Sequence, residues 1–314
     1  MSTDITQIES ILMPHLIRES QRLEKDDIKL VHYTSSENAF NILSGQTLWM
    51  RNTSCMNDYS EVIHGLNSVS IHLLDTDKNL KDFKVSDRTK EYLNASINKF
   101  DDIWSRSRLD ANIYVASLSE KLPSENGLGR LSMWRAYGGK NGVAIEFNNP
   151  AKTNGLNVFL YPAIYNDDEL KKELDSVIRN IDENVDYLDS LSQQTVVDHI
   201  VLSLLLLVVC KKHEGFSEER EWRLVYVPNL IQETEFALKN SVECINGLPQ
   251  IVYKLPVNGG LSPKINLTTM LHKVLIGPTE NAMQQALSFS MILNSIGLSD
   301  VDMKIERSDI PLRA

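Results

Sequence analysis

The order of apolar and polar residues predicts helices and strands along the whole chain. Between 5 and 26 the apolar residues recur every three or four positions, which predicts an N-terminal amphipathic helix. Strands are expected over 28–34 and 47–51. The short helix between them begins at a capping box, Thr34–Glu37, and ends at Gly45.

The later elements follow from the same patterns. Short apolar runs bounded by turn residues predict further strands, over 111–119, 143–147, 219–227, 250–257, 272–278 and 301–306. Helical spacing with capping or stop residues predicts further helices, over 58–74, 128–139, 280–296 and, as a pair, 167–213.

These elements mix without a strict alternation of strand, helix and strand. They therefore predict an α+β fold with a mixed, largely antiparallel central sheet and surrounding helices. We expect an N-terminal helix over 1–27 and one domain over 28–314. Within that domain, a helical insertion is expected around 75–110 and a helical pair around 167–213.

Composition narrows the class of protein. The net charge of −10 argues against a broad basic footprint for duplex nucleic acid. Three scattered cysteines, without a CxxC pair, fit a reducing compartment. The start of the chain lacks a signal-peptide layout, and the apolar run 200–210 is too short to span a bilayer, which needs about 20 residues. We expect a cytoplasmic protein that binds no membrane.

The segment EREWR, 219–223, has a high local density of charged residues that could take part in catalysis or binding. On a strand, Glu219, Glu221 and Arg223 would share one face. Two carboxylates on one face suit a reaction in which a sugar carbon becomes cationic, because one can stabilise that charge while the other orients an acceptor. The alternative is a solvated strand end with a weak Glu–Arg pair.

Each of the other candidate site residues has both a structural and a functional interpretation. His32 continues an apolar strand face, so it is either a core histidine or a ligand contact at a helix N-terminus. Trp134 and Tyr137, at i and i+3, are either core or a platform for a flat ring. Asp58 and Glu61 are explained by helix capping, although with Glu221 they could bind Mg²⁺.

Several motifs occur in order: HYTSSENAFNILSGQTLWM, NDYSE, VASLSE, MWRAYGGKNGVAIEF, EREWR, LIGP and SDIPLR. Together they resemble the bacterial domain-of-unknown-function family 2971, over roughly 28–313. The opening, with His32-Tyr33-Thr34 followed by Ile42, Leu43 and Gly45, also distantly resembles ADP-ribosyltransferase folds, as does the Glu-x-Glu of 219–221.

The second resemblance implies an enzyme that takes NAD as substrate, needs no metal and modifies nucleic acid or protein. It suggests a toxin or phage-defence effector with a regulatory or antitoxin partner. Its catalytic residues would be Glu221, Glu219 and Tyr137. The residues that it implies for NAD binding are His32, Tyr33, Thr34, Ser117, Ser119, Trp134 and Arg223. Position 33 departs from the pattern, because it is tyrosine where several ADP-ribosyltransferases have His-Gly-Thr or His-Ile-Thr.

Two other functions stay open on the sequence. One is a module that binds a nucleotide or a partner without catalysis. The other is a metal-dependent enzyme that processes nucleic acid.

Overall fold

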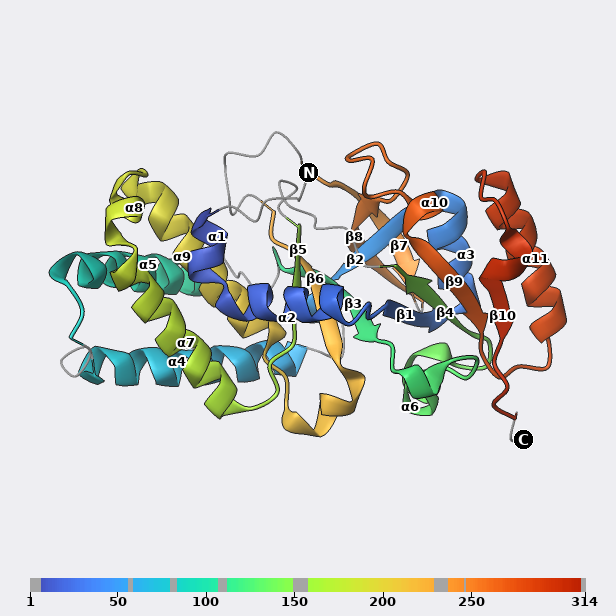
Figure 1. The fold of residues 1–314 in the computed structure, drawn as a ribbon, viewed down its shortest axis with the longest axis horizontal. Helices are drawn as coiled ribbons and strands as arrows, with labels where there is room; N and C mark the ends of the chain where they lie inside the picture. The colour runs from blue at the N-terminus through green and yellow to red at the C-terminus, as the bar shows by residue number, and fades with distance from the viewer. Residues whose placement is uncertain are drawn as a thin grey trace.

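The computed structural model describes residues 7–55, 59–79, 84–106, 112–148, 158–228, 237–245 and 247–311. Within these residues the molecule is elongated, with a lobe of helices at one end and a sheet flanked by helices at the other (Figure 1). This arrangement confirms the expected α+β fold with an open, mostly antiparallel sheet.

The strands form one branched sheet. They are β1 (Leu30–Ser35), β2 (Thr47–Asn52), β3 (Tyr114–Glu120), β4 (Gly142–Phe147), β5 (Val158–Pro162), β6 (Glu221–Tyr226), β7 (Lys239–Ile245), β8 (Leu248–Pro256), β9 (Leu271–Ile276) and β10 (Ile305–Arg307). The main path runs β10-β9-β4-β1-β3-β2-β8-β7, and β6 pairs with both β3 and β5. Among the described pairs, β9 with β10 is parallel and the others are antiparallel.

Strand β3 is the centre of the branching. Along one edge it pairs with β6 over six consecutive positions, from Tyr114 to Ser119. Its other edge is shared, because β2 pairs with its first two residues and β1 with its last two. The sheet therefore separates between β1 and β2, and the middle of β3 faces that separation.

The helices are α1 (Gln7–Leu12), α2 (Pro14–Lys25), α3 (Ser36–Gly45), α4 (Tyr59–Asn79), α5 (Asp87–Arg106), α6 (Leu131–Met133), α7 (Asp167–Glu183), α8 (Val185–Asp189), α9 (Gln193–Cys210), α10 (Leu267–Met270), α11 (Ala282–Ser295) and α12 (Val301–Lys304). Short helical turns add η1 (Thr53–Cys55), η3 (Pro123–Glu125), the π-helical turn η4 (Trp134–Gly138) and η5 (Glu214–Glu219).

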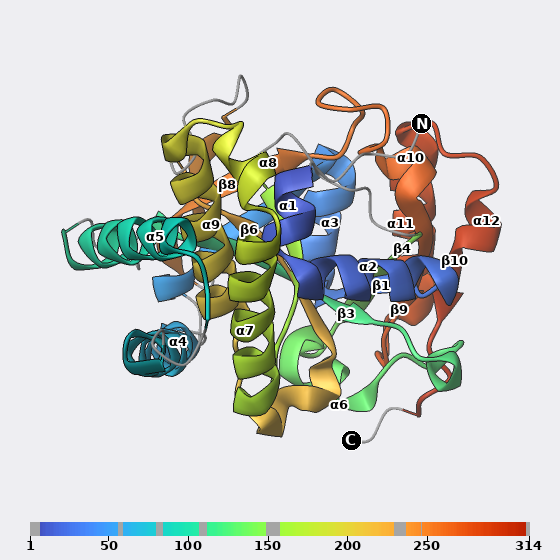
Figure 2. The same cartoon turned by 60° about the vertical axis from the view of Figure 1, so that its left-hand side comes forward.

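Helix α9 is the core of the helical lobe. Helices α4 and α5 pack against it and α1 closes one side, while α7 packs on α4 and α5 (Figures 1 and 2). Within the described residues it is the one helix long and apolar enough to cross a membrane, but most of it is buried in this lobe. Its apolar composition is explained by that burial, since a helix that is apolar all round packs inside a protein as well as in a bilayer.

Two apolar cores lie on the two faces of the sheet. Val225 of β6 and Val115 of β3 pack into the core around α9. Trp222 and Leu224, which alternate with Val225 along β6, belong to a second core that also includes buried residues of α3 and α11. Both faces of β6 are therefore buried, so neither of its faces meets water as a solvated strand end would.

Several predicted boundaries were wrong for local reasons. The N-terminal helix is two helices, because Pro14 begins α2 and lacks the amide hydrogen that would continue α1. Helix α3 is capped by Ser35, whose side chain accepts a hydrogen bond from the Asn38 amide at 3.2 Å. Thr34 is the last but one residue of β1 and does not cap α3.

Other elements differ from their predicted ranges. The predicted pair over 167–213 is three helices, since the short α8 lies between α7 and α9. Helix α4 extends beyond its predicted end at residue 74, to Asn79, and α5 lies where a helical insertion was expected. The last predicted strand, over 301–306, is mostly helix α12, and only its final two residues lie in β10. Asp58 lies outside the described residues.

Candidate functional site

A cluster of ionised side chains joins the helical lobe to the sheet. We call it the junction network, and its members are Glu61, Lys212, Glu219, Glu221 and Arg223. Glu61 comes from α4, Lys212 follows α9, Glu219 ends η5, and Glu221 and Arg223 lie on β6. Residues far apart in the chain therefore meet at the boundary of the two lobes.

Lys212 connects the three carboxylates. Its Nζ lies 2.6 Å from Glu221 Oε2 and 2.7 Å from Glu219 Oε2, and 3.6 Å from Glu61 Oε1. The side chain is 2% exposed. A buried ammonium group is costly unless it is paired, and these contacts supply that pairing.

Arg223 is the most deeply buried member of the network and contacts two of its carboxylates. Its Nε donates to Glu221 Oε1 at 2.9 Å, one Nη donates to Glu61 Oε2 at 2.5 Å, and the other donates to the Val209 carbonyl at 2.5 Å. The residue is fully buried. It therefore ties α4, α9 and β6 together, and its guanidinium is not placed to receive a cofactor phosphate from solvent.

The charges in the network favour ionised Glu221. Burial alone would raise the pKa of this carboxyl, but the adjacent Arg223 and Lys212 outweigh burial and lower its pKa to about 2. For Lys212, burial opposes the charged form, whereas Glu221, Glu61 and Glu219 together raise its pKa. Three carboxylates face two cations, so the network holds one more negative charge than positive.

Local backbone geometry explains how Glu219 reaches the network. Arg220 adopts a left-handed conformation with φ of 45°, which ends η5 and begins β6. Glu219 was predicted to share a strand face with Glu221, but it precedes the strand. The turn brings the two carboxylates to the same ammonium group from different elements.

The outer edge of the network is open to solvent. The Tyr137 hydroxyl donates to Glu219 Oε1 at 3.1 Å, and Tyr137 is 44% exposed. Nearby, the Ser132 hydroxyl donates to Glu218 Oε1 at 2.9 Å. The Glu219 side chain is 16% exposed, compared with 4% for Glu221. Glu219 and Tyr137 are therefore accessible to a ligand, and Glu221 lies behind them.

Arg130 and Ser119 fix the backbone of this edge. One Nη of Arg130 donates to the Glu218 carbonyl at 2.5 Å and to Ser119 Oγ at 2.9 Å. The Ser119 hydroxyl donates to the Glu219 carbonyl. Arg130 is itself paired with Glu125 at 2.6 Å. Ser119, predicted to bind NAD, is instead buried and positions η5.

Trp134 and Tyr33 pack in a third, smaller core. Trp134 is 4% exposed, and its indole Nε1 donates to the Leu128 carbonyl at 3.0 Å. Tyr33 meets it edge-on, with ring centroids 5.0 Å apart. The Tyr33 hydroxyl accepts a hydrogen bond from the Arg130 amide at 2.9 Å. The predicted platform for a flat ring is therefore a buried tryptophan.

His32 is not brought to the junction network. Val31 is opposite Ser119 on β3, and Ser119 is opposite Glu221 on β6, so these three residues share one face of the sheet. His32, next to Val31, points to the other face. The structure brings Tyr137 and Glu221 into one cluster but leaves His32 outside it.

Ser117 and Thr34, also predicted to bind NAD, lie on the strands around His32. Its Nδ1 lies 2.8 Å from the carbonyl of Ser117, and because a carbonyl only accepts, this nitrogen carries the hydrogen. Burial lowers the pKa of His32, which favours the neutral ring. Thr34 accepts a hydrogen bond from Asn38 at 3.1 Å. These residues lie where the sheet separates.

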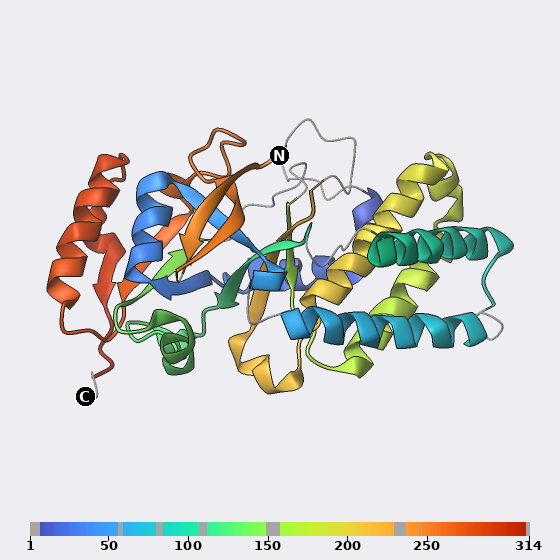
Figure 3. The ribbon, with the colours of Figure 1, turned by 180° about the vertical axis from the view of Figure 1, so that it is seen from behind.

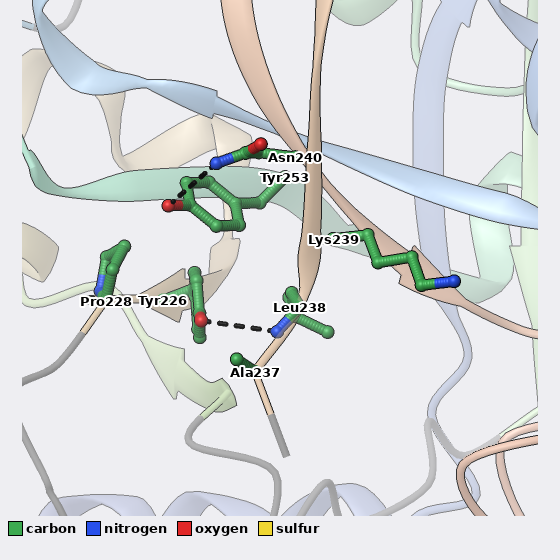
Figure 4. Close-up of a pocket in the computed structure, with 7 residues that line it drawn as sticks. All are labelled: Tyr226, Pro228, Ala237, Leu238, Lys239, Asn240 and Tyr253. Carbon is green, nitrogen blue, oxygen red and sulfur yellow. Dashed lines mark hydrogen bonds between the residues drawn. The ribbon is translucent and has the colours of Figure 1, made fainter.

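A pocket of about 420 Å³ lies at the far end of β6. Figure 4 shows its lining: Tyr226, Pro228, Ala237, Leu238, Lys239, Asn240 and Tyr253. Tyr226 alternates with Glu221 and Arg223 along the strand, so the pocket opens on the opposite face. None of the predicted site residues lines it.

The alternative Mg²⁺ site of Asp58, Glu61 and Glu221 has little support in this geometry. Glu61 and Glu221 both pair with Arg223, so a cation already lies between them. Within the described ranges, no group of three or more potential ligands is arranged to hold a metal ion. The third expected ligand, Asp58, lies outside those ranges.

The fold and the junction network define an α+β protein with a polar site between two lobes. A family model described as a protein of unknown function (DUF2971) matches residues 133–224. This span contains Tyr137, Lys212, Glu219, Glu221 and Arg223, and it supports the domain-of-unknown-function family for this part of the chain. The chain matches no curated protein and no solved structure.

Sequence reasoning missed two central residues. Lys212 follows the buried helix α9 and was not among the predicted site residues. Arg130 stands in LGRLSMW, five residues after Glu125, its ion-pair partner, and that spacing was not interpreted. A lysine pair directly after an apolar helix was the one available signal for Lys212, since lysine is rarely buried unless it is paired.

Proposed function

We propose that this protein is an ADP-ribosyltransferase-like enzyme that uses NAD, and that its reaction takes place at the outer edge of the junction network. One observation carries the proposal. Three separate motifs, NDYSE, MWRAY and EREWR, contribute Glu61, Tyr137 and the pair Glu219 and Glu221 to one cluster. Groups of ionisable residues at a partly open boundary often mark functional sites.

The proposed chemistry needs a carboxylate beside a sugar carbon. The bond between ribose C1 and the nicotinamide nitrogen breaks, and its electron pair leaves with nicotinamide. The acceptor then bonds to C1 and gives up a proton. In the transition state C1 is partly cationic, so a nearby negative charge stabilises it. The excess negative charge of the network provides such a field.

The geometry favours a division of roles between the two glutamates. Tyr137 is exposed and Glu219 is partly exposed, so they would contact the ribose or the acceptor. Each Glu221 oxygen already receives a hydrogen bond from a cation. In this proposal Glu221 is a positioning residue that holds Lys212, and through it Glu219. This differs from the catalytic role that the resemblance implied for Glu221.

The test is release of nicotinamide from NAD by the purified full chain. Wild-type protein should release nicotinamide, and Glu219→Gln should lose most of that activity. Glu243→Gln is the matched control, because Glu243 pairs with Lys254 on the β7–β8 hairpin, outside the junction network. Wild-type protein that neither binds NAD nor releases nicotinamide, with nucleic acid and protein acceptors supplied, would contradict the proposal.

A second function is favoured by the burial of Glu221. A carboxylate locked in two ion pairs suits a non-catalytic module that binds a nucleotide or a protein partner. In that case NAD or another nucleotide would protect the wild-type chain against thermal unfolding without being consumed. Glu219→Gln would then weaken the protection, with no turnover to lose.

A further inference from the structure

Helix α11 has an unusual surface. It contains no charged residue over its whole length, Ala282–Ser295. Phe289 and Leu293 face inward and are buried. A solvated outer helix normally carries charged residues on the face opposite its core. The outer face of α11 therefore carries no charge, and its exposed polar residues, Gln284, Ser288, Asn294 and Ser295, are all neutral.

Three large apolar side chains form a row on that outer face. Met283, Leu287 and Met291 are 59%, 55% and 74% exposed. They lie at i, i+4 and i+8, so they follow one another along the helix surface. Helix α12, which contacts α11, also presents Met303, which is 80% exposed. We call Met283, Leu287 and Met291 the α11 stripe.

We infer that the α11 stripe is the centre of a homodimer interface, in which α11 packs antiparallel against α11 of a second copy. The row is self-complementary, with leucine at its middle and methionine at each end. A two-fold axis through Leu287 places the two Leu287 side chains together, and each Met283 against Met291 of the partner subunit. Such reciprocal contacts are what two-fold symmetry requires.

The charge of the chain favours this face over others for self-association. With a net charge of −10, two copies repel each other over most of their surfaces. Helix α11 itself adds no charge to that repulsion. Methionine suits such contacts because its flexible side chain adapts to a facing surface.

The size and position of the stripe define the kind of dimer. An apolar patch of three side chains covers on the order of 300–400 Å², whereas a stable interface covers roughly 800 Å² per partner. The dimer should therefore form only as concentration rises. Helix α11 lies at the end of the molecule away from the helical lobe (Figures 1 and 3). Pairing there would leave the junction network of each copy open.

The test is sedimentation velocity of the full chain over a range of concentrations. Wild-type protein should shift from monomer to dimer, and Leu287→Glu should raise the dissociation constant at least about tenfold, because it sets two like charges together at the axis. Val242→Glu, at a 69% exposed position on β7, is the matched control and should dimerise like wild type. Circular dichroism melting checks that both variants fold.

A cross-linking experiment tests the predicted contact itself. Cys244 is exposed and is replaced by serine first. In that background Leu287→Cys should form a disulfide-linked dimer on mild oxidation, and Val242→Cys should not. A chain that stays monomeric at all concentrations would overturn the inference and leave the stripe to a different partner. A dimer that Leu287→Glu does not weaken would also overturn it.

Discussion

The ammonium group of Lys212 lies 2.6 Å from the carboxylate of Glu221, in a position where both side chains are almost completely buried. Neither charge would be stable there alone, because moving an unpaired ion out of water costs several kcal/mol. Lys212 also binds the carboxylate of Glu219, so the buried pair holds Glu219 in place at the partly exposed edge of the lobe junction. The stability of the junction and the geometry of the candidate site therefore depend on the same contacts.

Removing the Lys212 charge should destabilise the protein strongly. Lys212→Met keeps most of the side-chain volume but leaves Glu221 and Glu219 without their shared cation. We expect a loss of about 3–5 kcal/mol in the free energy of unfolding, measured with urea. Lys254→Met removes a 29% exposed partner of Glu243 and should cost less than about 1 kcal/mol. Equal losses in the two variants would contradict the structural role of Lys212.

The Tyr137 hydroxyl should matter for activity and not for stability. Tyr137→Phe removes its hydrogen bond to Glu219 from an exposed position. The free energy of unfolding should change by less than about 0.5 kcal/mol. Nicotinamide release should fall roughly tenfold to a hundredfold, the equivalent of one hydrogen bond to a charged group. Tyr187→Phe in the helical lobe is the control, and a similar loss there would argue against a specific role for Tyr137.

Gly129 should tolerate no side chain because Trp134 lies over it. A Cβ at this position would come within 2.7 Å of the indole ring. Gly247 has a similar φ, 78° against 70°, and none of the described residues has an atom within 4 Å of its Cβ position. Both Ala variants carry the same backbone strain, so their difference isolates the clash. We expect Gly129→Ala to be less stable than Gly247→Ala by about 1–3 kcal/mol in thermal or urea unfolding.

Stability should fall as the pH drops from 6.5 towards 4 because of His15. This residue is 2% exposed, and its Nε2 has no hydrogen-bond partner among the described residues. Burial, followed by the charges of Arg18 and Arg22, lowers its pKa to about 4. Between the two pKa values the unfolded chain binds a proton that the folded chain does not. The contribution of His15 is therefore complete above pH 6.5, and up to about 3 kcal/mol is lost by pH 4.

A variant separates the effect of His15 from that of its neighbours. Burial raises the pKa values of Glu169 and Glu173, which lie close to His15, and these groups act in the opposite direction. The difference in unfolding free energy between wild type and His15→Gln should therefore be followed across this pH range. A difference that does not change with pH would show that His15 does not carry the dependence.

Local patterns in the sequence were enough to predict the fold class and most strands. Period-two alternation in 221–227 and the apolar run in 143–147 are local signals, and both segments form strands. Strand β7 was not predicted because its exposed edge, KNSVECI, has a polar sequence. The break at Met13 was missed although Pro14 signals it.

The candidate site was harder to predict because its members are distant in sequence. Glu61 and Arg223 lie 162 positions apart, and no local pattern reports such a pair. The position of His32 followed from strand register, which the sequence does not specify. Glu219 lies outside β6 because Arg220 adopts a left-handed backbone conformation. Glycine is the residue that usually marks such a conformation in a sequence, and this position is arginine.

The most direct test of the account is the location of NAD on the protein, measured by amide hydrogen exchange with and without NAD. If the junction edge is the site, exchange should slow over η4 and η5, which carry Tyr137 and Glu219, and stay unchanged over β1 and α3. Protection confined to β1 and α3, around His32, would contradict the placement and move the site to where the sheet separates.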